Sequence, residues 1–70
     1  MAYYNLEVAE TRKVLSDATA ADRFGALGVF GKELGVTLTF DEQGGAPPYL
    51  FEEWYEGPHW INPKIPVYEA

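Results

Sequence analysis

The first part of the chain carries apolar residues at helical spacing. Tyr4, Val8 and Leu15 fall at positions i, i+4 and i+11, on one side of a helix. Asn5 is a residue type that caps helix N-termini well. The pattern therefore predicts a helix over about residues 5–18.

The next segment predicts a second helix, over about residues 20–34. Thr19 and Asp22 have the spacing of a capping box, with aspartate in place of the usual glutamate. Gly35 follows the last apolar position, where glycine commonly ends a helix. Because the middle of this segment is apolar nearly all round, we expect the helix to be buried on more than one side.

Glycines recur along this second segment. Gly28 and Gly31 would share one face of the helix with Phe24. The stretch FGALGVFG lacks the residue order of a phosphate-binding loop. We therefore expect this glycine face to be buried against a closely packed backbone.

After residue 35 the apolar period changes from helical to alternating. VTLTF, residues 36–40, alternates and is rich in β-branched and aromatic residues, as strands are. DEQGGAPP, residues 41–48, has turn composition. Residues 49–55 predict a returning strand, with a single helical turn as the alternative. Prolines in residues 57–70 predict an extended arm.

These elements predict an α+β fold in a single small domain over residues 1–70. Two helices would be followed by an antiparallel β-hairpin and an extended, proline-rich C-terminal arm. A chain of 70 residues buries a modest share of its surface on folding. We expect its eleven aromatic residues to supply a rich core, or a dimer or larger partner to add stability.

Charge is unevenly distributed along the chain, whose formal net charge is −6. Residues 36–70 carry six acids against Lys64 alone, whereas residues 1–35 carry five acids and four basic residues. Such a field disfavours direct binding to nucleic-acid phosphates and favours a basic protein surface. We therefore expect a larger protein partner with a basic surface and no direct nucleic-acid contact.

The composition also excludes several classes of protein. With no cysteine, the chain has no disulfide and no cysteine-based zinc site. No stretch approaches the ~20 apolar residues of a membrane-spanning helix, and the N-terminal residues do not resemble a secretory leader. These features favour a cytoplasmic protein without a membrane partner.

Residues able to carry catalysis are scarce. A nucleophilic triad would have to join Ser16 to His59, the only serine and the only histidine, and no nucleophile turn surrounds that serine. Glu56 and His59 have metal-ligand spacing, but Gly-Pro lies between them and two ligands do not fill a metal's coordination shell. We therefore expect no catalytic residue, no metal and no cofactor, and interpret the protein as not an enzyme.

Adjacent carboxylates at residues 41–42 and 52–53 do not change this interpretation. Neighbouring residues of a strand point to opposite faces, so neither pair converges on one substrate. Solvated acids on the surface are the expected outcome.

The C-terminal aromatics have two interpretations. They can fold back and complete the core, or some can be exposed anchors at an interface surrounded by steering acids. We expect Phe51, Ile61 and Ile65 to be mainly inside. The predicted partner-binding residues are Asp41, Glu42, Glu52, Glu53, Trp54, Tyr55, Glu56, Trp60 and Tyr68.

The leading functional hypothesis is a non-enzymatic protein-binding module that occupies a basic, nucleic-acid-handling surface of its partner. Phage-encoded inhibitors of host defence, such as anti-CRISPR proteins, and antitoxins are small acidic proteins of this class. The alternative is an accessory subunit of an enzyme or other permanent assembly. A homodimer joined through the strand edge of residues 36–40 is a third possibility.

Overall fold

The computed structural model describes residues 2–54 and 64–70. Within them, one helix and five strands follow the order β1 (Ala2–Val8), β2 (Val14–Ala20), α1 (Arg23–Leu34), β3 (Leu38–Thr39), β4 (Tyr49–Trp54) and β5 (Ile65–Glu69). All strand pairs are antiparallel, in the spatial order β2-β1-β4-β5-β3. The predicted two helices with a hairpin are therefore wrong, because the chain is mostly strand.

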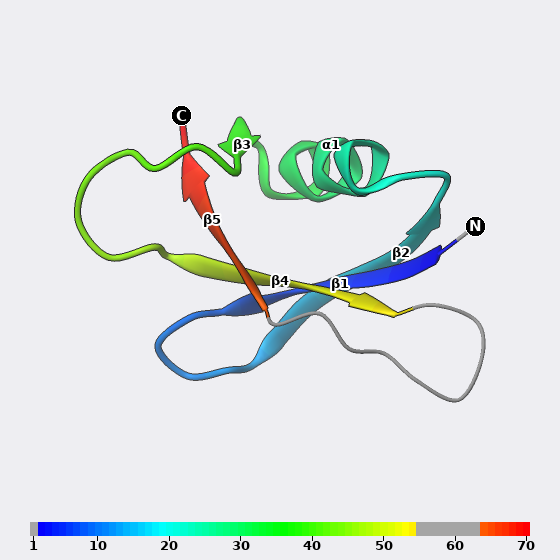
Figure 1. Ribbon diagram of the computed structural model, residues 1–70, viewed down its shortest axis with the longest axis horizontal. Helices are drawn as coiled ribbons and strands as arrows, with labels where there is room; N and C mark the ends of the chain where they lie inside the picture. The colour runs from blue at the N-terminus through cyan, green and yellow to red at the C-terminus, as the bar shows by residue number, and fades with distance from the viewer. Residues whose placement is uncertain (1, 55–63) are drawn as a thin grey trace.

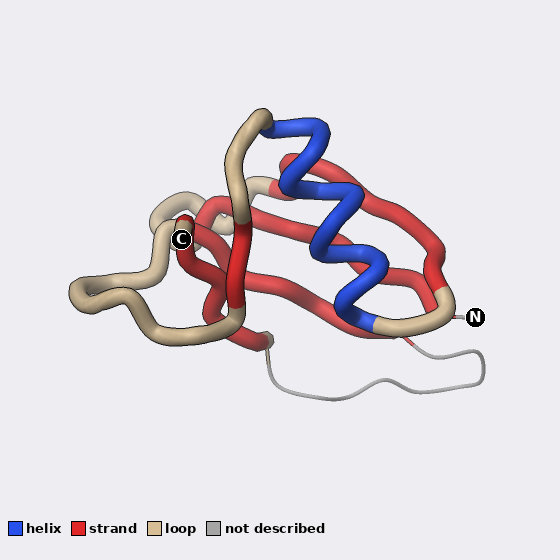
Figure 2. The backbone as a smooth tube through the Cα atoms, turned by 90° about the horizontal axis from the view of Figure 1, so that it is seen from above, coloured by secondary structure: helices blue, strands red, loops and turns tan. Residues whose placement is uncertain are grey.

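The sheet curls around the helix. Figure 1 shows α1 on one side of the strands, with β5 rising steeply from the sheet to meet β3. Seen from above, α1 runs diagonally across the strands (Figure 2). The helix therefore covers one face of the sheet, and we call the opposite face the outer face.

The helix predicted over residues 5–18 is replaced by β1, a turn and β2. Ala2, Tyr4 and Leu6 are buried in the core, so alternate residues of β1 point toward α1. The same residues also fit a helical stripe, but β1 gains a hydrogen-bonded partner on each side, β2 and β4. That pairing outweighs local helix preference, which is a weak force in a short segment.

The turn between β1 and β2 contains neither glycine nor asparagine. Val8 N–H donates to the Lys13 carbonyl at 2.9 Å, and Arg12 N–H donates to the Val8 carbonyl at 2.7 Å. Arg12 takes a left-handed φ of 63°, a conformation that is uncommon for such a residue. Because the usual turn residues are missing, no local signal in the sequence indicates a hairpin here.

Helix α1 begins later than predicted, at Arg23 rather than residue 20. Asp22 is the N-cap, and its Oδ1 accepts a hydrogen bond of 2.8 Å from the Gly25 N–H. At the other end Gly35 adopts a left-handed φ of 74°, and its N–H bonds to the Gly31 carbonyl. The C-terminal end of the predicted helix is thus correct, and Thr19 belongs to β2 instead of the cap.

The prediction of a buried glycine face is correct at one position only. Gly31 is buried, and a Cβ there would lie 2.7 Å from the Val36 carbonyl oxygen. Gly28 has open space around it, and Phe24 is 70% exposed. The close backbone approach therefore concerns Gly31 and the chain just after the helix, not a continuous groove.

The predicted hairpin between residues 36–40 and 49–55 is also wrong. Strand β3 has two residues and pairs with β5, whereas β4 lies between β1 and β5. Part of the predicted arm, Ile65–Glu69, is therefore a strand of the sheet. Pro66 is tolerated there, opposite Leu50, although proline removes one backbone donor. The rest of the predicted arm, residues 57–63, lies outside the described residues.

The core lies between α1 and the sheet. Phe51 is fully buried at its centre, and its ring packs edge-on to Phe30 of α1 and to Phe40 at centroid distances of 6.0 and 5.1 Å. Tyr4 of β1 lies 5.3 Å from the same ring. Phe51 is therefore inside, as predicted, and it joins the helix to the middle of the sheet.

Within the described residues, no helix is both long enough and apolar enough to cross a membrane.

Candidate functional site

The outer face of the sheet gathers acidic and aromatic side chains. In β1, Tyr3 and Asn5 alternate with the core residues and so point away from α1. Asn5 pairs with Asp17 of β2 on one side and with Glu52 of β4 on the other. Directly paired residues share a face, so these side chains form one row across three strands.

The neighbouring row supplies the aromatics. Tyr3 pairs directly with Trp54 at the end of β4. Tyr3 is 39% exposed and Trp54 is 41% exposed, so each presents part of its ring to solvent. We call Tyr3, Asn5, Asp17, Glu52 and Trp54 the outer-face cluster.

The tyrosine links the two rows. Its hydroxyl donates a hydrogen bond of 3.0 Å to Asp17 Oδ2. Burial, that hydrogen bond and the nearby negative charges of Asp17 and Glu52 all raise the pKa of Tyr3 above its ordinary value. The hydroxyl therefore lies within the field of both carboxylates, although they come from different strands.

The two buried acids of the described residues are neutralised by basic side chains. Glu7 receives Lys64 Nζ at 2.8 and 3.0 Å from its two carboxylate oxygens. Glu53 lies 2.7 Å from Arg23 Nη2 in an ion pair whose geometry is not that of a hydrogen bond. Neither ion pair involves the outer-face cluster, so Lys64 and Arg23 do not neutralise its acids.

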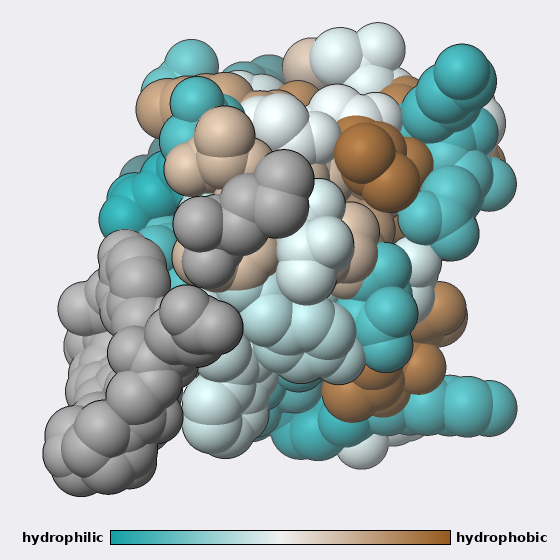
Figure 3. All heavy atoms as spheres, turned by 90° about the vertical axis from the view of Figure 1, so that its right-hand side faces the viewer, coloured by the Kyte–Doolittle hydropathy of each residue, from teal (hydrophilic) through white to brown (hydrophobic). Residues whose placement is uncertain are grey.

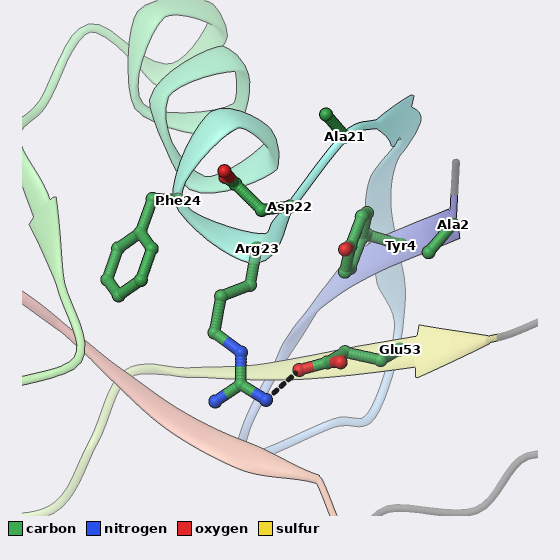
Figure 4. Close-up of a pocket in the computed structure, with 7 residues that line it drawn as sticks. All are labelled: Ala2, Tyr4, Ala21, Asp22, Arg23, Phe24 and Glu53. Atoms are coloured by element: carbon green, nitrogen blue, oxygen red, sulfur yellow. Dashed lines mark ion pairs between the residues drawn. The ribbon is translucent and has the colours of Figure 1, made fainter.

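A pocket of about 400 Å³ surrounds the ion pair of Glu53 and Arg23. Figure 4 shows the Arg23 side chain extending from the start of α1 to Glu53 on β4, with Tyr4 on one side of it and Phe24 on the other. The buried carboxylate of Glu53 in this pocket is already paired with Arg23, and this ion pair holds the start of α1 against the sheet.

These pairings leave a negative surface. The two buried acids pair with three of the five basic residues, since Arg12 also lies 4.0 Å from Glu7, so two basic residues remain against nine other acids in the sequence. In the outer-face cluster, neither Asp17 nor Glu52 has an ion-pair partner among the described residues. The cluster is thus a place where a cation from outside would be favoured.

The side of the molecule at which β4 ends is mixed in polarity. Hydrophobic residues form small patches there, separated by hydrophilic ones (Figure 3). The described residues seen on this side form no broad apolar patch. The surface resembles instead the polar interfaces at which a few aromatic residues act as anchors.

The structure separates the residues predicted to bind a partner. Glu52 and Trp54 belong to the outer-face cluster. Glu53 points to the helix side and is 3% exposed, and Tyr68 is also buried. Asp41 and Glu42 are exposed in the loop after β3. Tyr55, Glu56 and Trp60 lie outside the described residues.

The loop acids do not join the cluster. They follow β3, at the sheet edge farthest from β2, and their loop leads into the start of β4, whereas Trp54 ends that strand. Figure 1 shows the loop and the tip of β4 at opposite ends of the molecule. A partner that contacts the cluster alone would leave Asp41 and Glu42 free.

Three residues of the cluster escaped sequence analysis, namely Tyr3, Asn5 and Asp17. Asn5 was interpreted as a helix cap and Asp17 as part of the same helix. The alternation in AYYNLEV was a signal for the first two, because it places Tyr3, Asn5 and Glu7 on one face of a strand, but that stretch does not include Asp17.

Catalytic and metal-binding chemistry finds no support among the described residues. Ser16 Oγ donates to both carboxylate oxygens of Glu33, at 3.0 and 2.9 Å, and so ties β2 to α1. No group of three or more candidate metal ligands occurs in residues 2–54 and 64–70. His59, for which the sequence predicts neither a catalytic nor a metal-binding role, lies outside those ranges.

Comparison with known proteins finds no matching family model, no matching curated protein and no matching solved structure. The functional argument therefore depends on the geometry of the chain itself.

Proposed function

We propose that the protein is a non-enzymatic binding protein that docks the outer face of its sheet on a basic surface of a larger protein. The observation that carries the proposal is the outer-face cluster, in which two exposed aromatics lie beside two acids without an ion-pair partner among the described residues. Aromatic anchors supply binding energy, and acids steer a basic partner into contact.

A basic surface that handles nucleic acid is the target that this charge fits best. The protein would then act by occupying that surface, as inhibitors of the phage anti-defence type or antitoxins do. Full mimicry of a nucleic-acid backbone would need a denser array of charge, because duplex DNA carries one negative charge per about 1.7 Å. A mixed aromatic and acidic interface needs only the residues of the cluster.

The test compares two charge reversals of equal size at different places. One variant carries Asp17→Lys with Glu52→Lys, in the outer-face cluster, and the matched control carries Asp41→Lys with Glu42→Lys, in the distant loop. Each tagged protein is used in pull-downs from native lysate at low and high salt, followed by association kinetics with the purified partner.

The proposal predicts that the outer-face variant loses a salt-sensitive partner which the loop control retains. Rim charges act mainly on the association rate, so that rate should fall and its salt dependence should flatten. The proposal fails if both variants retain the partner, or if the loop control alone loses it. A partner held with no dependence on salt would indicate an accessory subunit in a permanent assembly instead.

A further inference from the structure

Asn5 carries a buried acceptor without a donor. The residue is 8% exposed, and its Oδ1 accepts no hydrogen bond within the part of the chain that the structure describes. A buried polar atom without a partner costs about 1–3 kcal/mol, and native proteins retain few of them. Its place in β1 puts the side chain on the outer face, between Asp17 and Glu52.

The surroundings of this oxygen call for a positively charged donor. Asp17 and Glu52 flank it from the adjacent strands, and strands lie about 4.8 Å apart. Two carboxylates and an amide oxygen thus present acceptors along one row, with no ion pair to either acid among the described residues. Only a group with several donors can serve such a row.

The aromatics of the next row favour a flat cation. Tyr3 and Trp54 are paired across β1 and β4, directly beside the row of acceptors. A guanidinium is planar, carries five N–H donors in a fixed fork and stacks on aromatic faces. An ammonium is a compact point charge with three donors and fits this combination less well.

We propose that the outer-face cluster binds an arginine side chain of the partner, with the guanidinium donating to the carboxylates of Asp17 and Glu52 and, once the buried Asn5 amide turns outward, to Asn5 Oδ1. The aromatic faces of Tyr3 and Trp54 lie against the same group. This inference rests on the proposed function and names the chemistry that the docking surface selects.

Binding would compete with one existing contact. The Tyr3 hydroxyl already donates to Asp17 Oδ2 at 3.0 Å, so a guanidinium that takes this oxygen displaces the hydroxyl. The pKa of Tyr3 is raised partly by that hydrogen bond and by both acids. A bound cation should therefore lower the pKa of Tyr3 toward its ordinary value.

The experiment is an NMR titration of the ¹⁵N-labelled protein with Nα-acetyl-L-arginine methylamide. The lysine and citrulline methylamides serve as comparison probes, since citrulline keeps the shape and lacks the charge. We expect saturable shifts at the Asn5 side-chain amide and the Trp54 indole, with affinity in the millimolar range and in the order arginine, lysine, citrulline. Tyr3 should titrate at lower pH with the arginine probe present.

Variants locate the site. Asp17→Asn with Glu52→Gln should weaken arginine binding by about tenfold or more, while Asp41→Asn with Glu42→Gln should leave it unchanged. If the outer-face double variant fails to fold, Glu52→Gln alone, on a partly exposed side chain, gives the same comparison. Equal shifts with arginine and citrulline, or equal weakening by the loop variant, would overturn the inference. In that case the pull-down contrast between the charge reversals still decides the proposed function.

Discussion

Glu52 and Glu53 are adjacent in β4 and point to opposite faces of the sheet. Glu53 is buried on the helix side, 2.7 Å from Arg23. Glu52 is partly exposed on the outer face, opposite Asn5. The alternation of side chains along a strand places these two identical residues on opposite faces, where their roles differ. One holds α1 to the sheet, and the other belongs to the proposed docking surface.

Neutralising these two acids should affect stability unequally. Glu53→Gln removes the charge that faces Arg23, and we expect it to cost about 1–3 kcal/mol of unfolding free energy. The cost is below that of a fully buried pair because the Arg23 side chain is 42% exposed. Glu52→Gln should change stability by less than about 0.5 kcal/mol. Urea denaturation of both variants measures the difference, and equal effects would contradict it.

Two glycine-to-alanine substitutions in α1 should change the stability of the protein in opposite directions. Gly31→Ala brings a Cβ to 2.7 Å from the Val36 carbonyl oxygen, which is backbone and cannot move aside cheaply, so we expect a loss of about 1–3 kcal/mol. Gly28→Ala meets open space and should raise stability by up to about 1 kcal/mol through helix propensity. Thermal melts of the two single variants test this pair. A melting temperature that Gly31→Ala leaves unchanged would refute the close approach.

Relief of backbone strain in the turn between β1 and β2 should be measurable. Arg12 has a φ of 63°, so Arg12→Gly should stabilise the protein by about 0.5–1 kcal/mol. Its contact with Glu7 is 4.0 Å long and 62% of the Arg12 side chain is exposed, so losing that contact should cost little. Lys13→Gly, at a position without positive φ, is the control and should destabilise. Chemical denaturation that ranks the two variants in the reverse order would contradict the prediction.

Tyr3 should make stability depend on alkaline pH. Its pKa is raised, first by burial and then by Asp17 and Glu52, so the folded state holds the phenolic proton more tightly than the unfolded chain. That contribution is complete below about pH 10 and is lost as the pH rises through the folded pKa.

Tyr3→Phe removes this contribution. Between about pH 9 and pH 11 its unfolding free energy should fall less steeply than that of the unsubstituted protein. Urea denaturation at a series of pH values checks the slopes, and Asp17→Asn should bring the phenolate absorbance transition of Tyr3 to lower pH. Parallel slopes for Tyr3→Phe and the unsubstituted protein would show that Tyr3 has no such role.

Some features of this protein could be read from the sequence because their causes are local. The second helix was predicted from its apolar middle and its terminal glycine, and Gly35 has the left-handed φ that a helix end needs. Strand β4 was predicted from its alternation, and Phe51 was predicted inside. The surplus of acids is a fact of the composition, and the protein partner that it favours stays a prediction.

The sequence failed where two local patterns competed. Residues 5–18 fit a helical stripe, and Ala2, Tyr4 and Leu6 equally fit a strand with one buried face. What separates these possibilities is the hydrogen bonding of β1 to β2 and β4. Strand β4 begins at Tyr49, more than forty residues after β1 ends at Val8. The spacing of apolar residues within a short segment carries no information about a strand partner that lies so far along the chain.

By itself, then, the sequence determined the composition of the surface and the places where the chain can turn or cap a helix. Only the tertiary structure decided that Tyr3, Asn5 and Asp17 from the N-terminal strands join Glu52 and Trp54. The physical reason is that side-chain alternation assigns each residue to a face, but strand order and register decide which residues meet on it.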